Sequence, residues 1–170
     1  TSSAEPLTQR SSFSRSADFF ATGATMAADN DGDSNVDTLL SSATVQVTAA
    51  DLAPGATIQQ AILYWGGSIH DMDDCSPSSP STVDTTVILA APLATFPVQI
   101  TADVCYCDAA GAASYDIQAC RADVTAAVQN SGTALAGAWT VSDFAAYIDD
   151  GATHNASFAV RVVYAAPNLP

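Results

Sequence analysis

The chain has 170 residues, 48% hydrophobic and 13% charged, which is long enough for a two-layer core and too apolar for a disordered protein. It contains no lysine, four arginines and eighteen acidic residues, so its formal net charge is −14. This charge repels nucleic acid and anionic lipid, and neither is expected as a partner. No run approaches the roughly 20 apolar residues of a membrane span, so no membrane insertion is expected.

The N-terminal residues are predicted to form an arm followed by a strand. Residues 1–12 are rich in Ser and Thr and have no hydrophobic periodicity, which is typical of a flexible terminus. Residues 13–22 can form a first strand, which Gly23 is predicted to end. We therefore divide the chain into an arm or first strand over residues 1–22, which can be exchanged between subunits, and a β-sandwich domain over residues 23–170.

Oxygen-bearing side chains recur at every second position between residues 29 and 37. Clustered carboxylates need either a cation or full solvation, and Asp is a favoured ligand of hard cations. Gly32 supplies a turn, but it is the fourth residue of the segment and no Glu follows, which excludes an EF-hand loop. The alternative is a solvated turn. The pattern predicts a looser Ca²⁺ site with the ligands Asp29, Asp31, Asp33, Asn35 and Asp37.

The middle of the chain contains the strongest strand signal. Residues 43–48 alternate and predict a half-buried strand, and a Pro-Gly turn follows at residues 52–56. Residues 58–65 are apolar on both sides, so we expect a central strand that is buried on two faces and ended by Gly66 and Gly67. Residues 70–82 form a long polar loop, whose Asp73 and Asp74 either complete a cation site or are solvated.

The second half of the chain continues the pattern of short strands. Residues 123–129 predict a short helix capped by Asp123, and residues 143–148 fit either a helix or a strand. Pro97 places its strand at a sheet edge. The whole order predicts an all-β fold, an antiparallel β-sandwich of Greek-key or jelly-roll type with one short helix. The further strands are expected at residues 83–91, 95–102, 104–107, 138–141 and 157–164.

The four cysteines indicate disulfide bonds, and with them an extracellular location. Cys105 and Cys107 share one strand face and cannot bridge each other without strain, which leaves two connectivities. We favour Cys107–Cys120, which closes a local loop, together with Cys75–Cys105, which ties the acidic loop to the sheet. A zinc site is not expected, because Cys-x-Cys with one distant His lacks the usual ligand spacing.

Three segments together resemble a known class of protein. They are LAPGA at residues 52–56 leading into AILYWGGS at 61–68, RADVT at 121–125 followed by WTV at 139–141, and FAVRVVY at 158–164. The set resembles secreted bacterial β-sandwich domains of large cell-surface and adhesin-like proteins, as in myxobacteria and actinobacteria, over residues 20–170. The resemblance implies an extracellular, non-enzymatic role that is structural or adhesive.

One departure from that class leads to a hypothesis about assembly. The final strand of such domains is usually followed by more sequence, whereas this chain stops at Pro170. A sandwich that lacks its last strand exposes a sheet edge, and edges recruit strands from other chains. We hypothesise that the arm, or the segment to Thr22, pairs with a neighbouring subunit and propagates a filament head to tail. The alternative is an arm packed on its own domain.

No enzyme is expected. His70 and His154 are the only histidines, the latter is expected in a surface loop, and no Ser lies in a Gly-x-Ser-x-Gly elbow. Trp65 and Trp139 are expected in the core rather than in a sugar-binding cleft.

The predicted function is that of an extracellular structural protein, a subunit of a surface filament or fibre assembled by strand addition, with the chain itself as partner. The alternative is a monomeric adhesin or carbohydrate-binding module with glycan partners. Trp139, Tyr147 and Tyr164 would then form a sugar-stacking platform, against the alternative that they are core. Asn155 begins an Asn-x-Ser sequence that could accept a glycan in a source that glycosylates such sites.

Overall fold

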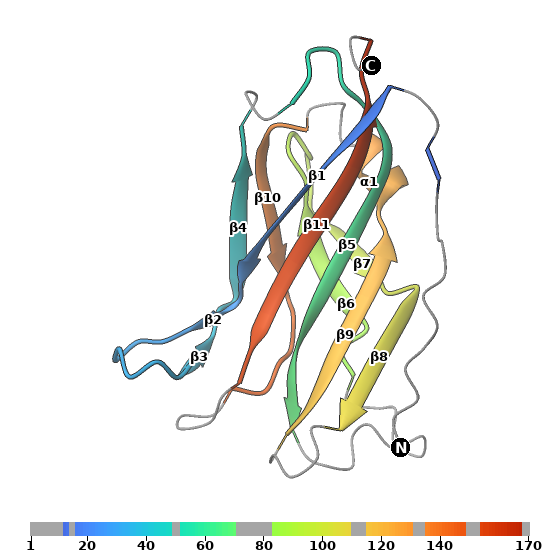
Figure 1. Cartoon of the computed structure of the whole chain (residues 1–170). Helices are drawn as coiled ribbons and strands as arrows, with labels where there is room; N and C mark the ends of the chain where they lie inside the picture. Colours follow the sequence, from blue (N-terminus) through green and yellow to red (C-terminus); the bar gives the residue numbers. More distant parts are fainter. Residues whose placement is uncertain are drawn as a thin grey trace.

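A computed structural model of the chain describes residues 12–13, 16–48, 52–70, 83–109, 115–130, 135–148 and 154–167. The fold is an antiparallel β-sandwich with one short helix, as predicted (Figure 1). Its elements are β1 (Ala17–Thr25), β2 (Ala27–Ala28), β3 (Thr38–Leu39), β4 (Ser42–Val47), β5 (Thr57–His70), β6 (Thr86–Ala90), β7 (Val98–Thr101), β8 (Val104–Ala109), β9 (Tyr115–Asp123), α1 (Thr125–Asn130), β10 (Gly137–Ser142) and β11 (Ala156–Ala165).

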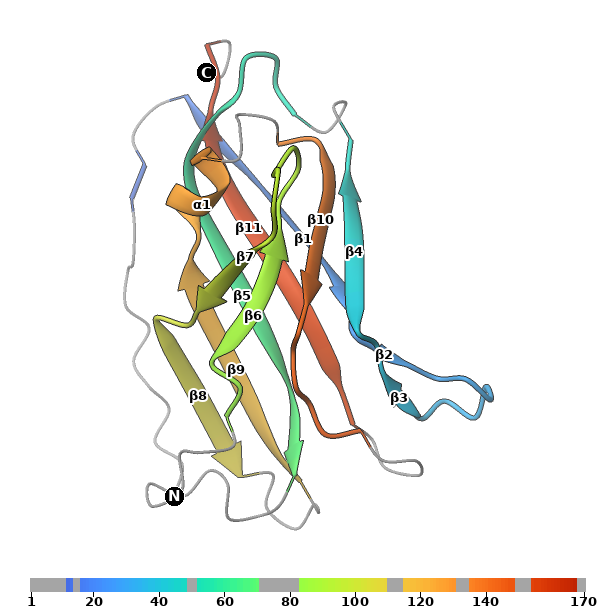
Figure 2. The ribbon, with the colours of Figure 1, turned by 180° about the vertical axis from the view of Figure 1, so that it is seen from behind.

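Two sheets form the layers of the sandwich. The front sheet in Figure 1 has five strands in the order β1-β11-β5-β9-β8, and the sheet in front in Figure 2 has four in the order β4-β10-β6-β7. All neighbouring strands are antiparallel. The core lies between the sheets, because alternate residues of each strand point inward. Its fully buried large side chains include Leu63 and Trp65 of β5, Val87 of β6, Trp139 and Val141 of β10, and Val160 and Val162 of β11.

Helix α1 closes one end of the sandwich beside the start of β5 (Figure 2). Its N-terminal Thr125 hydroxyl accepts the Ala61 N–H at 2.9 Å, and the Val124 N–H donates to the Ala61 carbonyl at 2.9 Å. The Asp123 carboxylate accepts the Thr125 N–H at 2.9 Å, which confirms Asp123 as a cap. The helix therefore satisfies backbone groups of β5 just where its pairing with β9 ends, at Ile62.

The central strand is longer than predicted. β5 lies in the middle of its sheet, but it runs through Gly66 and Gly67 to His70, so the prediction that the glycines end it was wrong. A Cβ at Gly66 would lie 2.7 Å from the Gln118 carbonyl oxygen, so the glycine permits close approach of β9 rather than a turn. Burial on two faces was also overestimated, because Tyr64 on the outer face is 37% exposed.

The first and last strands are neighbours in the five-stranded sheet. β1 pairs with β11 of its own chain from Ala17 to Thr25, so it crosses both the proposed division at residue 22 and Gly23 without a break. β11 itself lies between β1 and β5. The last strand is thus internal, and the edges of this sheet are β1 and β8. Residues 1–11 lie outside the described part of the chain.

Most other strand predictions are confirmed, and three strands were missed, namely β9 and the two-residue strands β2 and β3. β4, β6, β8, β10 and β11 lie within or close to the predicted ranges, and β7 is an edge strand, as Pro97 indicated. Residues 143–148 are neither helix nor strand. β9 was not predicted, because its inward-facing positions include the polar Asp116 and Gln118 while Ile117 points outward. This reverses the usual hydrophobic pattern of a half-buried strand.

Candidate functional site

The predicted calcium segment is the loop that joins β2 to β3. This short hairpin projects sideways from the sandwich, beyond the ends of the sheets (Figures 1 and 2). Gly32 and Ser34 both have positive φ, 82° and 77°, and Asp29 accepts the N–H groups of Gly32 at 2.6 Å and Ser34 at 3.0 Å. The loop is therefore wound around the Asp29 carboxylate, as Asx turns are.

Three of the five predicted ligands come together. One carboxylate oxygen from each of Asp29, Asp31 and Asp37 lies within 4.8 Å of the others. The other two ligands, Asp33 and Asn35, bond each other instead, since Asp33 accepts the Asn35 backbone N–H at 2.7 Å and its side-chain amide at 2.9 Å. The arrangement offers carboxylate oxygens from a largely exposed loop, which is the kind of donor set that Ca²⁺ accepts.

The carboxylates of this loop perturb one another electrostatically. The N–H of Gly32, followed by those of Ser34, Asp31 and Asp33, lowers the pKa of Asp29 despite some desolvation. The Asp33 N–H also lowers the pKa of Asp31, but repulsion from Asp33, Asp37 and Asp29, together with desolvation, outweighs it and leaves that pKa raised. A cation between Asp29, Asp31 and Asp37 would relieve this repulsion.

The cysteine pairing differs from the one we favoured. Cys105 and Cys120 form a disulfide with a Cα–Cα distance of 4.0 Å, so the predicted Cys107–Cys120 and Cys75–Cys105 bridges were wrong. The reason is the register of the β8–β9 hairpin, which places Cys105 directly opposite Cys120 and Cys107 opposite Gln118. Cys107 is also disulfide-bonded, whereas Cys75 lies outside the described residues.

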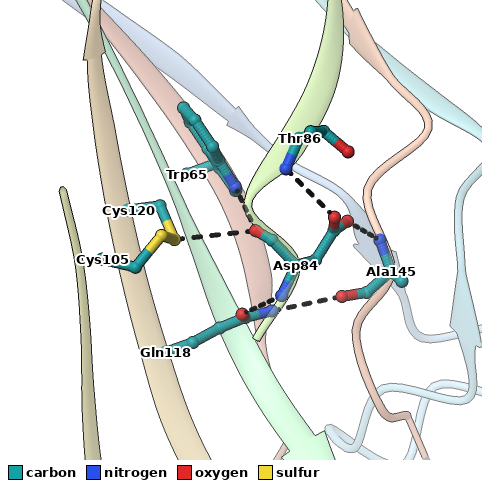
Figure 3. The surroundings of a disulfide bond; sticks show 7 residues. All are labelled: Trp65, Asp84, Thr86, Cys105, Gln118, Cys120 and Ala145. Carbon is teal, nitrogen blue, oxygen red and sulfur yellow. Dashed lines mark hydrogen bonds between the residues drawn. A yellow bond between two sulfur atoms is a disulfide. The ribbon is translucent and has the colours of Figure 1, made fainter. Parts of the chain in front are cut away.

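Beside this disulfide, a polar network connects the two sheets (Figure 3). The Asp84 carbonyl, just before β6, accepts Trp65 Nε1 at 3.0 Å, and the Asp84 N–H donates to Gln118 Oε1 at 2.7 Å. Gln118 Nε2 donates to the Ala145 carbonyl at 3.2 Å, and the Ala145 N–H donates to the Asp84 carboxylate at 2.7 Å. The Cys120 sulfur lies 3.6 Å from the Asp84 carbonyl as a packing contact, since a disulfide sulfur carries no hydrogen.

This network is structural in character. Gln118 is fully buried, and both ends of its amide are hydrogen-bonded, as a buried polar group requires. Each bond joins segments that are distant in sequence, from β5, the residues just before β6, β9 and the segment after β10. The network thus fixes how the two sheets are stacked, and no sequence motif predicted it.

The aromatic residues lie mostly in the core. Trp65 and Trp139 are buried, as predicted, and Trp139 packs edge-on against Phe20 with ring centroids 6.3 Å apart. Tyr164 is buried as well, so Trp139, Tyr147 and Tyr164 do not form the sugar platform considered above.

The remaining candidate residues are dispersed. His154 is buried against Tyr147, with ring centroids 5.1 Å apart, so the expectation of a surface histidine was wrong. Asn155 is exposed immediately before β11, where an attached glycan would meet solvent. Asp73 and Asp74 lie outside the described residues, so their part in a cation site stays a prediction.

Comparison with known proteins identifies no relative. No family model, no curated protein and no solved structure matches the chain. No helix in the described ranges is long and apolar enough to cross a bilayer.

Proposed function

We propose that the chain is an extracellular structural protein, a subunit of a surface filament or fibre in which sandwich domains join by strand addition. The observation that carries this proposal is the pair of open edges of the four-stranded sheet. β4 and β7 each have one neighbour among the described strands. An unpaired edge presents a row of N–H and C=O groups that another strand can bind.

Both edges are uncharged in a chain of net charge −14. Residues 40–48, around β4, and residues 91–102, around β7, contain no Asp, Glu, Lys or Arg. Natural edge strands are usually protected by charges, and here the apolar Leu93, Phe96 and Val98 are 72%, 76% and 44% exposed beside β7. The edges of the other sheet carry Asp18 in β1 and, just before β8, the exposed Asp103.

Strand directions favour the same pair of edges. In an antiparallel sheet of four strands the two outer strands run in opposite directions, so β4 is antiparallel to β7. Simple translation of one copy beside the next would therefore place β4 antiparallel to β7 and continue the sheet. In the five-stranded sheet, β1 and β8 run in the same direction and would meet as a parallel pair, which is slightly less stable.

The first prediction tests the β7 edge. Val98→Lys is expected to abolish ordered filaments of the purified chain in electron micrographs, because it places charge on the joining edge. Tyr106→Lys on β8 is the matched control, since Tyr106 is 46% exposed and Val98 is 44% exposed, and it should leave the filaments intact. Monodisperse particles of the unmodified chain at high concentration, or equal loss with both variants, would contradict the proposal.

The second prediction concerns Ca²⁺, which we propose binds Asp29, Asp31 and Asp37. Calorimetric titration is expected to give a Kd of about 0.1–1 mM, the range of extracellular calcium modules. Asp31→Asn should weaken binding at least about tenfold, because it removes one of three charged ligands. Asp143→Asn removes the same charge from an exposed position outside the loop and should have little effect. No heat of binding, or equal weakening by both variants, would rule out this site.

A further inference from the structure

The outer face of the five-stranded sheet carries many small side chains, together with exposed aromatic and a few polar ones. No described element lies over it in Figure 1. Cross-strand pairing arranges its residues in rows across the sheet. One row is Gly23, Ala159, Tyr64, Arg121 and Val104, and the next is Thr25, Ser157, Gly66, Ala119 and Tyr106.

The small residues of these rows form a shallow hollow beside Tyr64. It has a volume of about 260 Å³, and its outward-facing lining includes Tyr64, Gly66, Ala119, Ser157 and Ala159. Since a water molecule occupies about 30 Å³, the hollow has room for a ring-sized group rather than for a single water. Tyr64 offers such a ring both an apolar face and a hydroxyl group.

The same face carries the only arginines in the described part of the chain. Arg121 lies directly opposite Tyr64 on β9, and Arg161 lies diagonally from it on β11. Arg161 donates from Nη2 to Gln60 Oε1 at 3.0 Å. Within the described residues, the Nε atoms of both Arg121 and Arg161 are buried without an acceptor.

Two acidic residues lie close to Arg121 in the sheet, and the carboxylates of both accept backbone N–H groups. Asp123, two residues further along β9, accepts the Thr125 N–H at 2.9 Å, and Asp103 accepts the Asp123 N–H at 2.7 Å. The Arg121 guanidinium is chemically suited to an external carboxylate, because arginine binds carboxylates through two parallel N–H donors. The surrounding charge repels polyanions, which favours a ligand with a single carboxylate.

We infer that this face binds a saccharide carrying an isolated carboxylate, such as a uronic acid residue in an otherwise neutral glycan. The sugar ring occupies the hollow against Tyr64, and the carboxylate binds the terminal N–H groups of Arg121. A second copy of this chain is the alternative occupant, which the titration below distinguishes from a sugar. The inference is independent of filament formation.

The third prediction tests this site by NMR titration of the ¹⁵N-labelled full chain with methyl β-D-glucuronide in the presence of a calcium chelator. We expect the amide signals of Gly66, Ala119 and Ser157 to shift with a Kd of about 1 mM, as for other small ligands of this size. Methyl β-D-glucoside, which replaces the carboxylate with a neutral group, should bind at least about tenfold more weakly. The chelator excludes binding bridged by a cation at the Asp29 loop.

Variants then separate a specific contact from general charge. Arg121→Gln is expected to weaken glucuronide binding at least about tenfold, and Ala119→Trp to abolish it by filling the hollow. Arg161→Gln removes the same charge from a side chain already held by Gln60, so a loss below about threefold is expected. The inference would be overturned if these amides did not shift at about 20 mM glucuronide, or if both glycosides bound equally well. It would also be overturned if both arginine variants lost the same glucuronide affinity. Shifts of these amides on protein dilution instead of sugar addition would likewise overturn it, and would assign the face to a second copy.

Discussion

Trp65→Ala is expected to lower the free energy of unfolding by about 3–5 kcal/mol, the range for removing a buried Trp. The side chain is 1% exposed on the inner face of β5, so its removal leaves a cavity between the sheets. It also leaves the Asp84 carbonyl without the Nε1 donor that it accepts at 3.0 Å. Equilibrium denaturation of the oxidised protein, followed by Tyr fluorescence or circular dichroism, measures the loss.

Two phenylalanine substitutions distinguish the cavity from the hydrogen bond. Trp65→Phe keeps most of the buried ring and removes the bond to Asp84, so a loss of about 1–3 kcal/mol is expected. Trp139→Phe is the matched control, because Trp139 is also fully buried but donates to Leu135 only four residues away. If the inter-sheet network stabilises the stacking, Trp65→Phe should be the more costly of the two. Equal costs would mean that the Asp84 network adds nothing beyond ordinary burial.

The strands with one buried face were the most predictable part of this fold. β11 alternates along its length, and its even-numbered positions, Phe158 to Tyr164, are buried as the pattern predicts. Its position in the sheet could not be predicted, because a period of two residues indicates which face is buried and does not identify the neighbouring strands. The internal location of β11 depends on pairings with β1 and β5, which are far away in sequence.

β9 and the disulfide depend on contacts between distant segments, which the hydrophobic pattern of a single strand does not contain. Gln118 faces inward because Asp84 and Ala145 satisfy its amide, and both partners come from other parts of the chain. Because β9 was not predicted, the register of the β8–β9 hairpin was unknown. The sequence therefore could not show that Cys105 lies directly opposite Cys120. At the Asp29 loop the local spacing predicted three ligands that do converge, but it could not show that Asp33 and Asn35 bond each other.

Glycine was misinterpreted for a related reason. A Gly-Gly pair predicts a turn when only the local backbone is considered, because glycine tolerates positive φ. In this fold only Gly32, Gly55 and Gly137 among the described glycines use positive φ. Gly67 lies in the regular part of β5, and its missing side chain makes room for neighbouring segments on both sides.

Gly67→Val is accordingly expected to destabilise the protein by about 3 kcal/mol or more, through overpacking. A Cβ at this position would lie 2.7 Å from the Asn155 carbonyl oxygen and 3.2 Å from both the Ala146 Cβ and the Ala156 Cα. Two of these three atoms belong to backbone and the third is held by the segment after β10, so none can move without displacing its strand or segment. Thermal or denaturant unfolding of the variant measures the cost.

A pair of alanine substitutions separates close approach from backbone conformation. Gly67→Ala adds only the Cβ and should cost about 2–3 kcal/mol. Gly32→Ala adds the same atom in the β2–β3 loop, where φ is +82° and nothing lies within 4 Å, so only the backbone penalty of about 1 kcal/mol is expected. A larger loss of stability at Gly32 than at Gly67 would mean that the backbone dihedral angle, rather than close approach, is what requires glycine at these positions. A larger loss at Gly67 would mean that β5 runs through its glycines because β11 and the segment after β10 must pack directly against its backbone.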